Sequence, residues 1–234
     1  MRILNLVLFS PDTYYEKMYK ITSSYYKRFG FVDTVYYYYD KIDEPTRVGD
    51  FLIIPGKESL DSSITKKTIV AFEYFQSSLC EYDYVVRSNI STIVQFDLIL
   101  PLPHMTYGGY LINLQWLDPP SGIHDDTHFG TIFVSGTCII FSSQMVQQIL
   151  KNRHDINESI MDDVSFGIFA KKHSIEATDL TSCTLFMKKC QDIFSYLNEH
   201  KKMLCYRNRV DIHSKNRYVD VEQMKCIIKY LTSK

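Results

Sequence analysis

Apolar runs alternate with helix-like segments through residues 1–90, and this rhythm constrains the fold more than any other feature of the chain. Residues 3–9 form an apolar run in which Asn5 is the one polar residue, as expected of a strand that is buried on both faces. Asp12 or Thr13 can cap the helix that follows, and Gly30 can end it. The pattern predicts strands at residues 3–9, 32–39, 50–54 and 84–86 and helices at about residues 13–29 and 63–77. Such alternation predicts an α/β fold with a central, mostly parallel sheet flanked by helices.

The rest of the chain contains more turns but continues to alternate. A helix is predicted at residues 93–100, and the pair Gly108-Gly109 predicts a tight turn or a close backbone approach. Further predicted elements are a strand at residues 137–141 and helices at about residues 143–150, from about residue 162 and at residues 219–231. No linker or repeat divides the 234 residues. We therefore expect one domain, in which residues 1–100 bind a nucleotide and residues 101–234 carry the acceptor side, the catalytic groups and a basic tail.

The composition argues against several classes of protein. The formal net charge is −1, so the chain as a whole has no electrostatic attraction to nucleic acid or to an anionic membrane. The six cysteines form no C-x-x-C pair, and a chain of this length needs no disulfides to fold, which favours reduced thiols in the cytoplasm. No apolar stretch is long enough to cross a bilayer. We therefore expect a cytoplasmic protein without a membrane span.

Polar residues gather where two of the predicted strands end. In open α/β sheets, ligands bind beyond the carboxyl ends of the strands. Phe9 and Ser10 end the first strand, and Arg87, Ser88 and Asn89 lead out of the strand at residues 84–86. We expect these five residues to line a ligand pocket. Ordinary turn chemistry at a strand end is the alternative for Ser88 and Asn89.

Four short motifs follow one another along the chain. They are residues 82–92 (YDYVVRSNIST), 107–109 (YGG), 134–142 (VSGTCIIFS) and 162–167 (DDVSFG). In this order they resemble the motifs of fringe-like and β-1,3-galactosyltransferase-like enzymes. Residues 82–92 are closer still to glycosyltransferases from large DNA viruses, including chlorella viruses. The resemblance extends over about residues 1–230, and the order of the motifs is more specific than any one of them.

The resemblance implies a GT-A-like fold and a hexosyl- or pentosyltransferase that moves a sugar from a UDP-sugar to a glycan or protein-linked acceptor. In the resembling inverting enzymes, the second acid of the last motif deprotonates the acceptor hydroxyl. That acid is Asp163 here, with Asp162 beside it. Ser135 and Gly136 are then expected near the donor sugar, where a glycine permits close approach. Helix capping is the structural alternative for both acids. A viral origin would place the protein in the host cytoplasm.

The resemblance also implies a divalent metal ion, Mn²⁺, with a late histidine, here His213, among its ligands. The fringe-like enzymes carry an Asp-rich metal motif directly after the strand, whereas this chain has Ser88, Asn89 and Ile90 there. Uncharged side chains are poor ligands for a hard cation compared with carboxylates. This departure supports a second hypothesis, in which the protein is a catalytically degenerate module that binds a nucleotide-sugar or a glycan without turnover.

The C-terminal segment is basic. Residues 201–234 contain nine Lys or Arg and three Asp or Glu. Arg207, Arg209 and Arg217 are candidates for holding the diphosphate of a nucleotide-sugar, because guanidinium groups pair with phosphate in a bidentate manner. A solvated helix face, or local contact with the phosphates of a nucleic acid, is the alternative.

The segment His124-Asp125-Asp126-Thr127-His128 has the composition of a metal site. The Pro-Pro-Ser-Gly sequence just before it favours a loop. We expect a mobile loop on the acceptor side. A zinc site, which needs four ligands in a fixed geometry, is the alternative.

Overall fold

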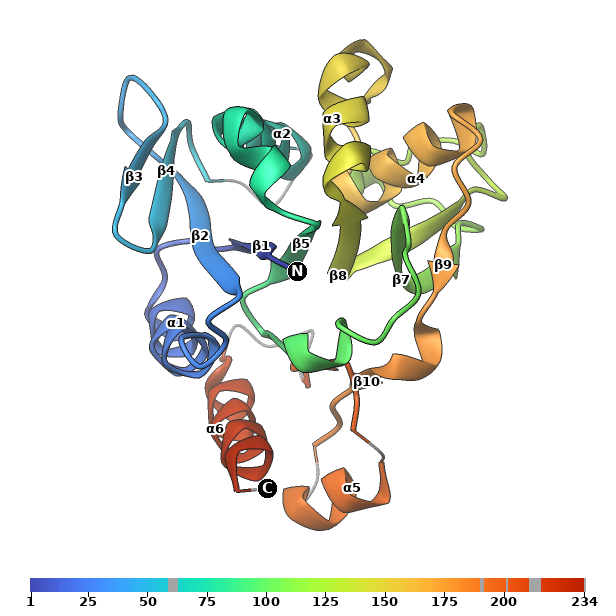
Figure 1. Ribbon diagram of the computed structural model, residues 1–234. Coiled ribbons are helices and arrows are strands. Elements are labelled where there is room, and N and C mark those ends of the chain that lie inside the picture. Colours follow the sequence, from blue (N-terminus) through green and yellow to red (C-terminus); the bar gives the residue numbers. More distant parts are fainter. Residues whose placement is uncertain (59–62, 190–191, 201, 211–215, 234) are drawn as a thin grey trace.

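The computed structural model describes residues 1–58, 63–189, 192–200, 202–210 and 216–233 (Figure 1). Within these residues, the centre of the molecule is an eight-stranded sheet with the order β3-β4-β2-β1-β5-β8-β7-β9. Its strands are β1 (Ile3–Leu8), β2 (Val32–Asp40), β3 (Thr46–Val48), β4 (Phe51–Pro55), β5 (Tyr84–Asn89), β7 (Tyr107–Asn113), β8 (Ile132–Ser142) and β9 (Thr178–Asp179). Strands β4, β2, β1 and β5 run parallel to one another, while β3 and β8 are antiparallel to their neighbours. The expected α/β fold with a mostly parallel sheet is confirmed.

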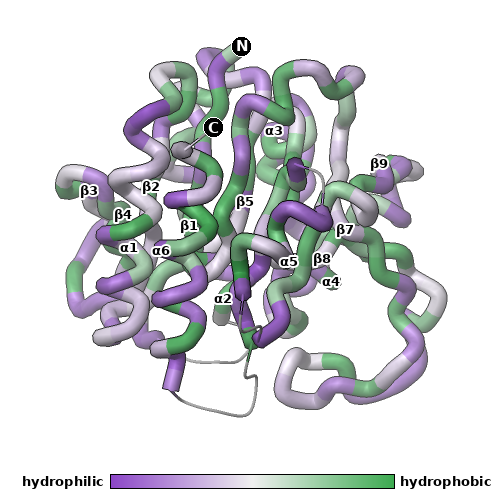
Figure 2. The backbone as a smooth tube through the Cα atoms, turned by 90° about the horizontal axis from the view of Figure 1, so that it is seen from below, coloured by the Kyte–Doolittle hydropathy of each residue, from purple (hydrophilic) through white to green (hydrophobic). Residues whose placement is uncertain are grey.

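Helices cover both faces of this sheet (Figure 1). One face packs against α2 (Ser63–Tyr74), α3 (Ser143–Lys151) and α4 (Asp162–Lys172). The other face packs against α1 (Thr13–Tyr26), α5 (Ile193–Glu199) and α6 (Tyr218–Thr232), which lie toward the viewer in Figure 2. A three-stranded sheet shares this second layer and consists of β10 (Thr184–Phe186), β11 (Cys205–Arg207) and β6 (Thr92–Val94). Short 3₁₀ helices lie at Gln76–Glu81, Phe96–Leu98, Pro119–Ser121, Arg153–Asp155 and Thr181–Cys183.

The N-terminal half folds largely as its sequence predicts. The apolar run at residues 3–9 becomes β1, which lies between β2 and β5 and is buried almost throughout. The carboxylate of Asp12 accepts a hydrogen bond from the backbone N–H of Tyr14 and so caps α1. The helix ends at Tyr26, three residues before the predicted end. The second predicted helix is also shorter, because the chain passes from α2 into a 3₁₀ helix after Tyr74.

Two predictions about the middle of the chain are wrong or incomplete. Residues 93–100 do not form one continuous helix: Ile93 and Val94 are wholly buried in β6, which pairs with β11, and Phe96–Leu98 form only a short 3₁₀ helix. β7 was not predicted, since its two glycines were interpreted as a turn or a close approach. The close approach is present: Gly109 has φ +152°, and a Cβ atom there would lie 2.6 Å from the carbonyl oxygen of Cys138.

The position of β8 brings distant parts of the chain to one edge of the sheet. β8 is antiparallel to β5, with Cys138 opposite Ser88. Residues just before Cys138 therefore lie beyond the carboxyl end of β5, at the edge where β1, β2 and β4 also end. The single sheet thus joins the predicted nucleotide-binding residues 1–100 to residues 101–234. In the part of the chain that the structure describes, no helix has the length and apolar character needed to cross a membrane.

Candidate active site at the carboxyl edge of the sheet

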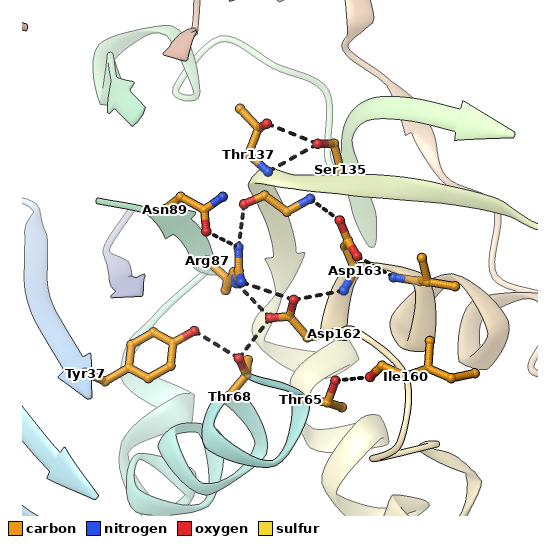
Figure 3. Close-up of polar contacts among 12 residues, drawn as sticks. Tyr37, Thr65, Thr68, Arg87, Asn89, Ser135, Thr137, Ile160, Asp162 and Asp163 are labelled. Atoms are coloured by element: carbon orange, nitrogen blue, oxygen red, sulfur yellow. Dashed lines mark hydrogen bonds and ion pairs between the residues drawn. The ribbon is translucent and has the colours of Figure 1, made fainter. Parts of the chain in front are cut away.

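An ion pair between Arg87 and Asp162 lies at the centre of the candidate site (Figure 3). The two side chains are only 2% and 1% exposed. Arg87 Nη2 donates to Asp162 Oδ1 at 3.1 Å, and Nε makes an ionic contact of 2.8 Å with Oδ2. Nη1 donates to Asn89 Oδ1 at 3.0 Å and to the carbonyl oxygen of Gly136. The charge of Asp162 raises the pKa of Arg87 although burial opposes this, so the guanidinium remains charged. Arg87, predicted to line a pocket, instead lies below the surface.

Every acceptor position of Asp162 is occupied. A carboxylate has two oxygens with about four lone-pair sites. Oδ1 accepts from Arg87 and, at 3.0 Å, from the backbone N–H of Asp163, while Oδ2 faces Arg87 Nε and accepts from Thr68 Oγ1 at 2.9 Å. Because the Thr68 hydroxyl donates to Asp162, the hydroxyl of Tyr37 donates to Thr68, across 2.9 Å. Asp162 thus holds β5, α2 and α4 together and has no lone pair left for a ligand.

Asp163 has free acceptor capacity. Its Oδ2 accepts from the backbone N–H of Gly136 and its Oδ1 from that of Val164, each at 2.8 Å. Each oxygen retains one lone-pair site, and the residue is partly exposed. Burial of the carboxyl, together with the charge of Asp162, raises the pKa of Asp163 to about 6. Of the two adjacent acids, Asp163 is therefore the one that can accept a proton.

Gly136 connects the two charged groups. Its carbonyl oxygen accepts from Arg87 and its N–H donates to Asp163, so a single residue of β8 contacts both. A Cβ atom at this position would lie 3.0 Å from Arg87 Nη1 and 3.1 Å from Asp163 Oδ2. The side chains of Arg87 and Asp163 therefore make the close approach that was expected at Gly136. Ser135 is partly exposed, and its hydroxyl donates to Thr137 Oγ1 at 3.0 Å.

A second cluster of positive charge lies beside the turn from β5 to β6. Arg207, at the end of β11, is buried, and its Nη1 donates to Ser91 Oγ at 2.6 Å. Burial, followed by repulsion from Arg217 and Arg209, lowers the pKa of Arg207 to about 9. Arg217 forms an ion pair with Asp220, whereas Arg209 is exposed. The structure brings the three predicted arginines together.

Residues at the end of β1 form a separate polar network. Phe9 is buried among aromatic rings, so it belongs to the core and presents no free ring to a base. Ser10 is partly exposed, and its hydroxyl donates to Glu58 Oε2 at 3.2 Å. Glu58 also accepts from the backbone N–H of Tyr39 at 2.7 Å and from Lys67 Nζ at 2.8 Å. Sequence reasoning missed Glu58 and Lys67, because nothing in the local pattern pairs them.

Ser88, Asn89 and His213 were also predicted to belong to the site. Ser88 is wholly buried on the opposite face of β5 from Arg87, and its Oγ has no hydrogen-bond partner in the described part of the chain. Asn89 is partly exposed at the end of the strand. His213 lies outside the described residues. Thr68 and Ser91 were missed, although Ser91 belongs to the polar cluster that follows β5.

The segment His124–His128 forms a loop, as predicted. A cavity of about 230 Å³ is lined by His124, Asp125, Thr127 and His128 from this loop and by Asn157. Among the residues that the structure describes, no three His, Cys, Asp or Glu side chains are grouped as metal ligands. The predicted loop conformation is confirmed, and the role of the loop on the acceptor side stays a prediction.

The sheet order, the two helical layers and the charged edge define a GT-A-like fold. A solved glycosyltransferase, involved in the glycosylation of the major capsid of PBCV-1, is similar in structure with a TM-score of 0.54. The match covers 97% of this chain and 100% of that chain at 10% sequence identity. At this identity the likeness shows the fold alone, which is the viral glycosyltransferase-like fold that the motif order predicts. No family model and no curated protein matches the chain.

Proposed function

We propose that the protein is a glycosyltransferase that moves a sugar from a nucleotide-diphosphate sugar, most simply a UDP-sugar, to a hydroxyl group of a glycan or protein-linked acceptor. The single observation that carries the proposal is Asp163. It is a carboxylate with free lone pairs and a raised pKa, at the sheet edge where ligands bind in this class of fold. Inverting glycosyl transfer to a hydroxyl group uses a base of this kind. The viral glycosyltransferase with the same fold adds support.

In the proposed reaction, Asp163 takes the proton of the acceptor hydroxyl while that oxygen attacks the anomeric carbon. The bond from that carbon to the phosphate oxygen breaks, and the nucleoside diphosphate leaves with the bonding electrons. Attack from the side opposite the leaving group inverts the anomeric configuration. Asp162 and Arg87 act as positioning residues, because their ion pair and the Gly136 peptide hold the Asp163 carboxylate in place.

A panel of nucleotide-sugars tests the proposed donor class. Ligands that bind the native state raise its stability by about 2.7 kcal/mol at a concentration of 100 times Kd. For a chain of this size, that corresponds to a rise in Tm of about 5–10 °C. We expect such a rise with one of the UDP-, GDP- or CMP-sugars in a thermal-shift measurement, followed by product formation with an added glycan. A panel that leaves Tm unchanged throughout would contradict the donor class.

Donor hydrolysis separates an active transferase from a degenerate binding module. The uncharged Ser88-Asn89 pair, in place of acidic residues, is the observation that favours the module. An active enzyme releases free nucleotide from the bound donor slowly even without acceptor, whereas a module binds the donor and releases none. Binding without release in the presence of a broad set of acceptors would therefore favour the module.

The pH dependence of the reaction should report the ionisation of Asp163. A general base acts in its deprotonated form, so activity is present above its pKa and is lost as the pH falls through it. Burial and Asp162 raise this pKa to about 6. We expect kcat/KM to fall tenfold per pH unit below about pH 6. A profile from pH 4.5 to 8.5 measures this, and an unchanged rate at pH 5 would exclude Asp163 as the base.

A further inference from the structure

Arg207 carries a buried positive charge that no carboxylate of the described residues balances. Among the described residues, the one hydrogen-bond partner of its guanidinium is the neutral hydroxyl of Ser91. Arg217 does not neutralise this charge, because Arg217 is itself cationic and forms an ion pair with the nearby Asp220. A buried charge without a partner is costly, and proteins keep such charges where a ligand of opposite sign completes the site. The arrangement therefore calls for an anion.

The turn that holds Arg207 has further hydrogen-bond donors. Ser88 and Thr92 flank the turn that carries Ser91, and both are buried. Within the described residues their hydroxyl oxygens have no hydrogen-bond partner. Hydroxyl and guanidinium groups are typical phosphate ligands. The local chemistry thus fits a phosphate-type anion at the carboxyl edge of β5.

The side chains at the carboxyl edge of β5 do not suit a divalent cation. Mn²⁺ and Mg²⁺ take oxygen ligands, with at least one carboxylate in most protein sites. The oxygens of Asp162 already accept from Thr68, Arg87 and the backbone N–H of Asp163, and Asn89 supplies its carbonyl oxygen to Arg87. Of the two adjacent acids, only Asp163 keeps free acceptor capacity, one lone-pair site on each oxygen. Among the described residues, which do not include His213, no three His, Cys, Asp or Glu side chains are grouped as metal ligands.

We propose that Arg207, assisted by the exposed Arg209, neutralises the diphosphate of the nucleotide donor, so that donor binding requires no divalent metal ion. The proposal rests on the glycosyltransferase function proposed above and specifies how its leaving group is held. When the bond to the anomeric carbon breaks, the departing diphosphate gains one negative charge. A fixed guanidinium stabilises this charge without any change in coordination.

Binding of UDP and GDP to the full chain, measured by calorimetry in EDTA and again in Mn²⁺, tests the proposal. We expect one nucleotide to bind with the same Kd in both buffers. Arg207→Met should weaken this binding by at least about 30-fold, because it removes one partner of a buried charged contact. Arg207→Lys should weaken it less. Lys229→Met removes an exposed charge from α6 and is the matched control, with no expected change.

The stability of the free protein distinguishes a ligand-binding role from a structural one. Without ligand, no carboxylate of the described residues balances the charge of Arg207, so Arg207→Met should raise Tm even as it weakens nucleotide binding. A lower Tm with unchanged Kd would make Arg207 structural and overturn the proposal. Binding that appears only with Mn²⁺ would overturn the metal-free site and leave the glycosyltransferase function standing. Absence of binding by either nucleotide in both buffers would overturn both.

Discussion

Asp163→Asn is expected to lower kcat by about 10²–10⁴-fold, the usual contribution of a positioned general base. The amide has nearly the same shape as the carboxylate, and its oxygen still accepts one of the two backbone N–H groups that Asp163 binds. It does not take the acceptor proton. The proposed donor contacts are those of Arg207 and Arg209, so the donor Kd should remain nearly the same. Single-turnover rates and donor titrations on the same preparation measure the two quantities separately.

Asp97→Asn is a matched control for this experiment. Asp97 is an exposed acid on a 3₁₀ helix, and its replacement removes one negative charge of the same kind. We expect wild-type kcat and Kd from it. Wild-type turnover in Asp163→Asn would eliminate Asp163 as the base. Loss of donor affinity together with kcat would instead make Asp163 a residue that organises the donor pocket.

The parts of the fold that could be predicted depend on local pattern. β1 is apolar except at Asn5, and Asp12 is followed by the residue types of a helix start, so both were found. Residues 93–94 were misassigned, because apolar residues fit a helix or a strand about equally well. Their partner is β11, more than 100 residues later in the chain. Strand propensity depends on such neighbours, which the local sequence does not contain.

For the candidate site, the local sequence indicated the residues but not the pairs that they form. The order of the motifs indicated Asp162 and Asp163, and position after a buried strand indicated Arg87 and Asn89. Which group pairs with which was not visible, because Arg87 and Asp162 are 75 residues apart. The sequence therefore predicted that Arg87 lines a pocket, whereas its side chain is buried in an ion pair with Asp162. Position relative to a strand identifies the residues of a site, whereas the partners follow only from the folded chain.

One signal in the sequence does account for the two clusters. Asn89, the last residue of β5, contacts Arg87, and Ser91, in the turn that follows, contacts Arg207. Arg87 and Asn89 are alternate residues of the strand and so share one of its sides. This short segment therefore links the ion pair that positions Asp163, the proposed proton acceptor, to Arg207, whose positive charge no described carboxylate balances. A proton acceptor and a positive charge on separate residues suit the proposed reaction, in which a proton moves to Asp163 and the diphosphate leaves toward Arg207.

Arg87→Met is expected to cause the largest loss of stability, about 3–5 kcal/mol of the free energy of unfolding. The substitution leaves the 1%-exposed carboxylate of Asp162 without its cation. Removal of one partner from a buried ion pair costs more than the pair itself contributes, because the remaining charge stays desolvated. Arg87→Met combined with Asp162→Asn removes that charge as well. We therefore expect the double variant to regain part of the loss, although the introduced amide would keep only some of the contacts that the carboxylate makes.

Urea denaturation at pH 7 measures these differences, and a change in midpoint at constant slope identifies an effect on stability. Arg153→Met is the matched control, since Arg153 pairs with Glu73 and Glu158 but is 39% exposed. An exposed ion pair contributes about 0–1 kcal/mol, so this variant should lose far less. Equal losses in Arg87→Met and Arg153→Met would contradict a buried ion pair. The larger loss at Arg87 would show that the same interaction that holds the Asp163 carboxylate in place, through Gly136, also holds β5, β8 and α4 together.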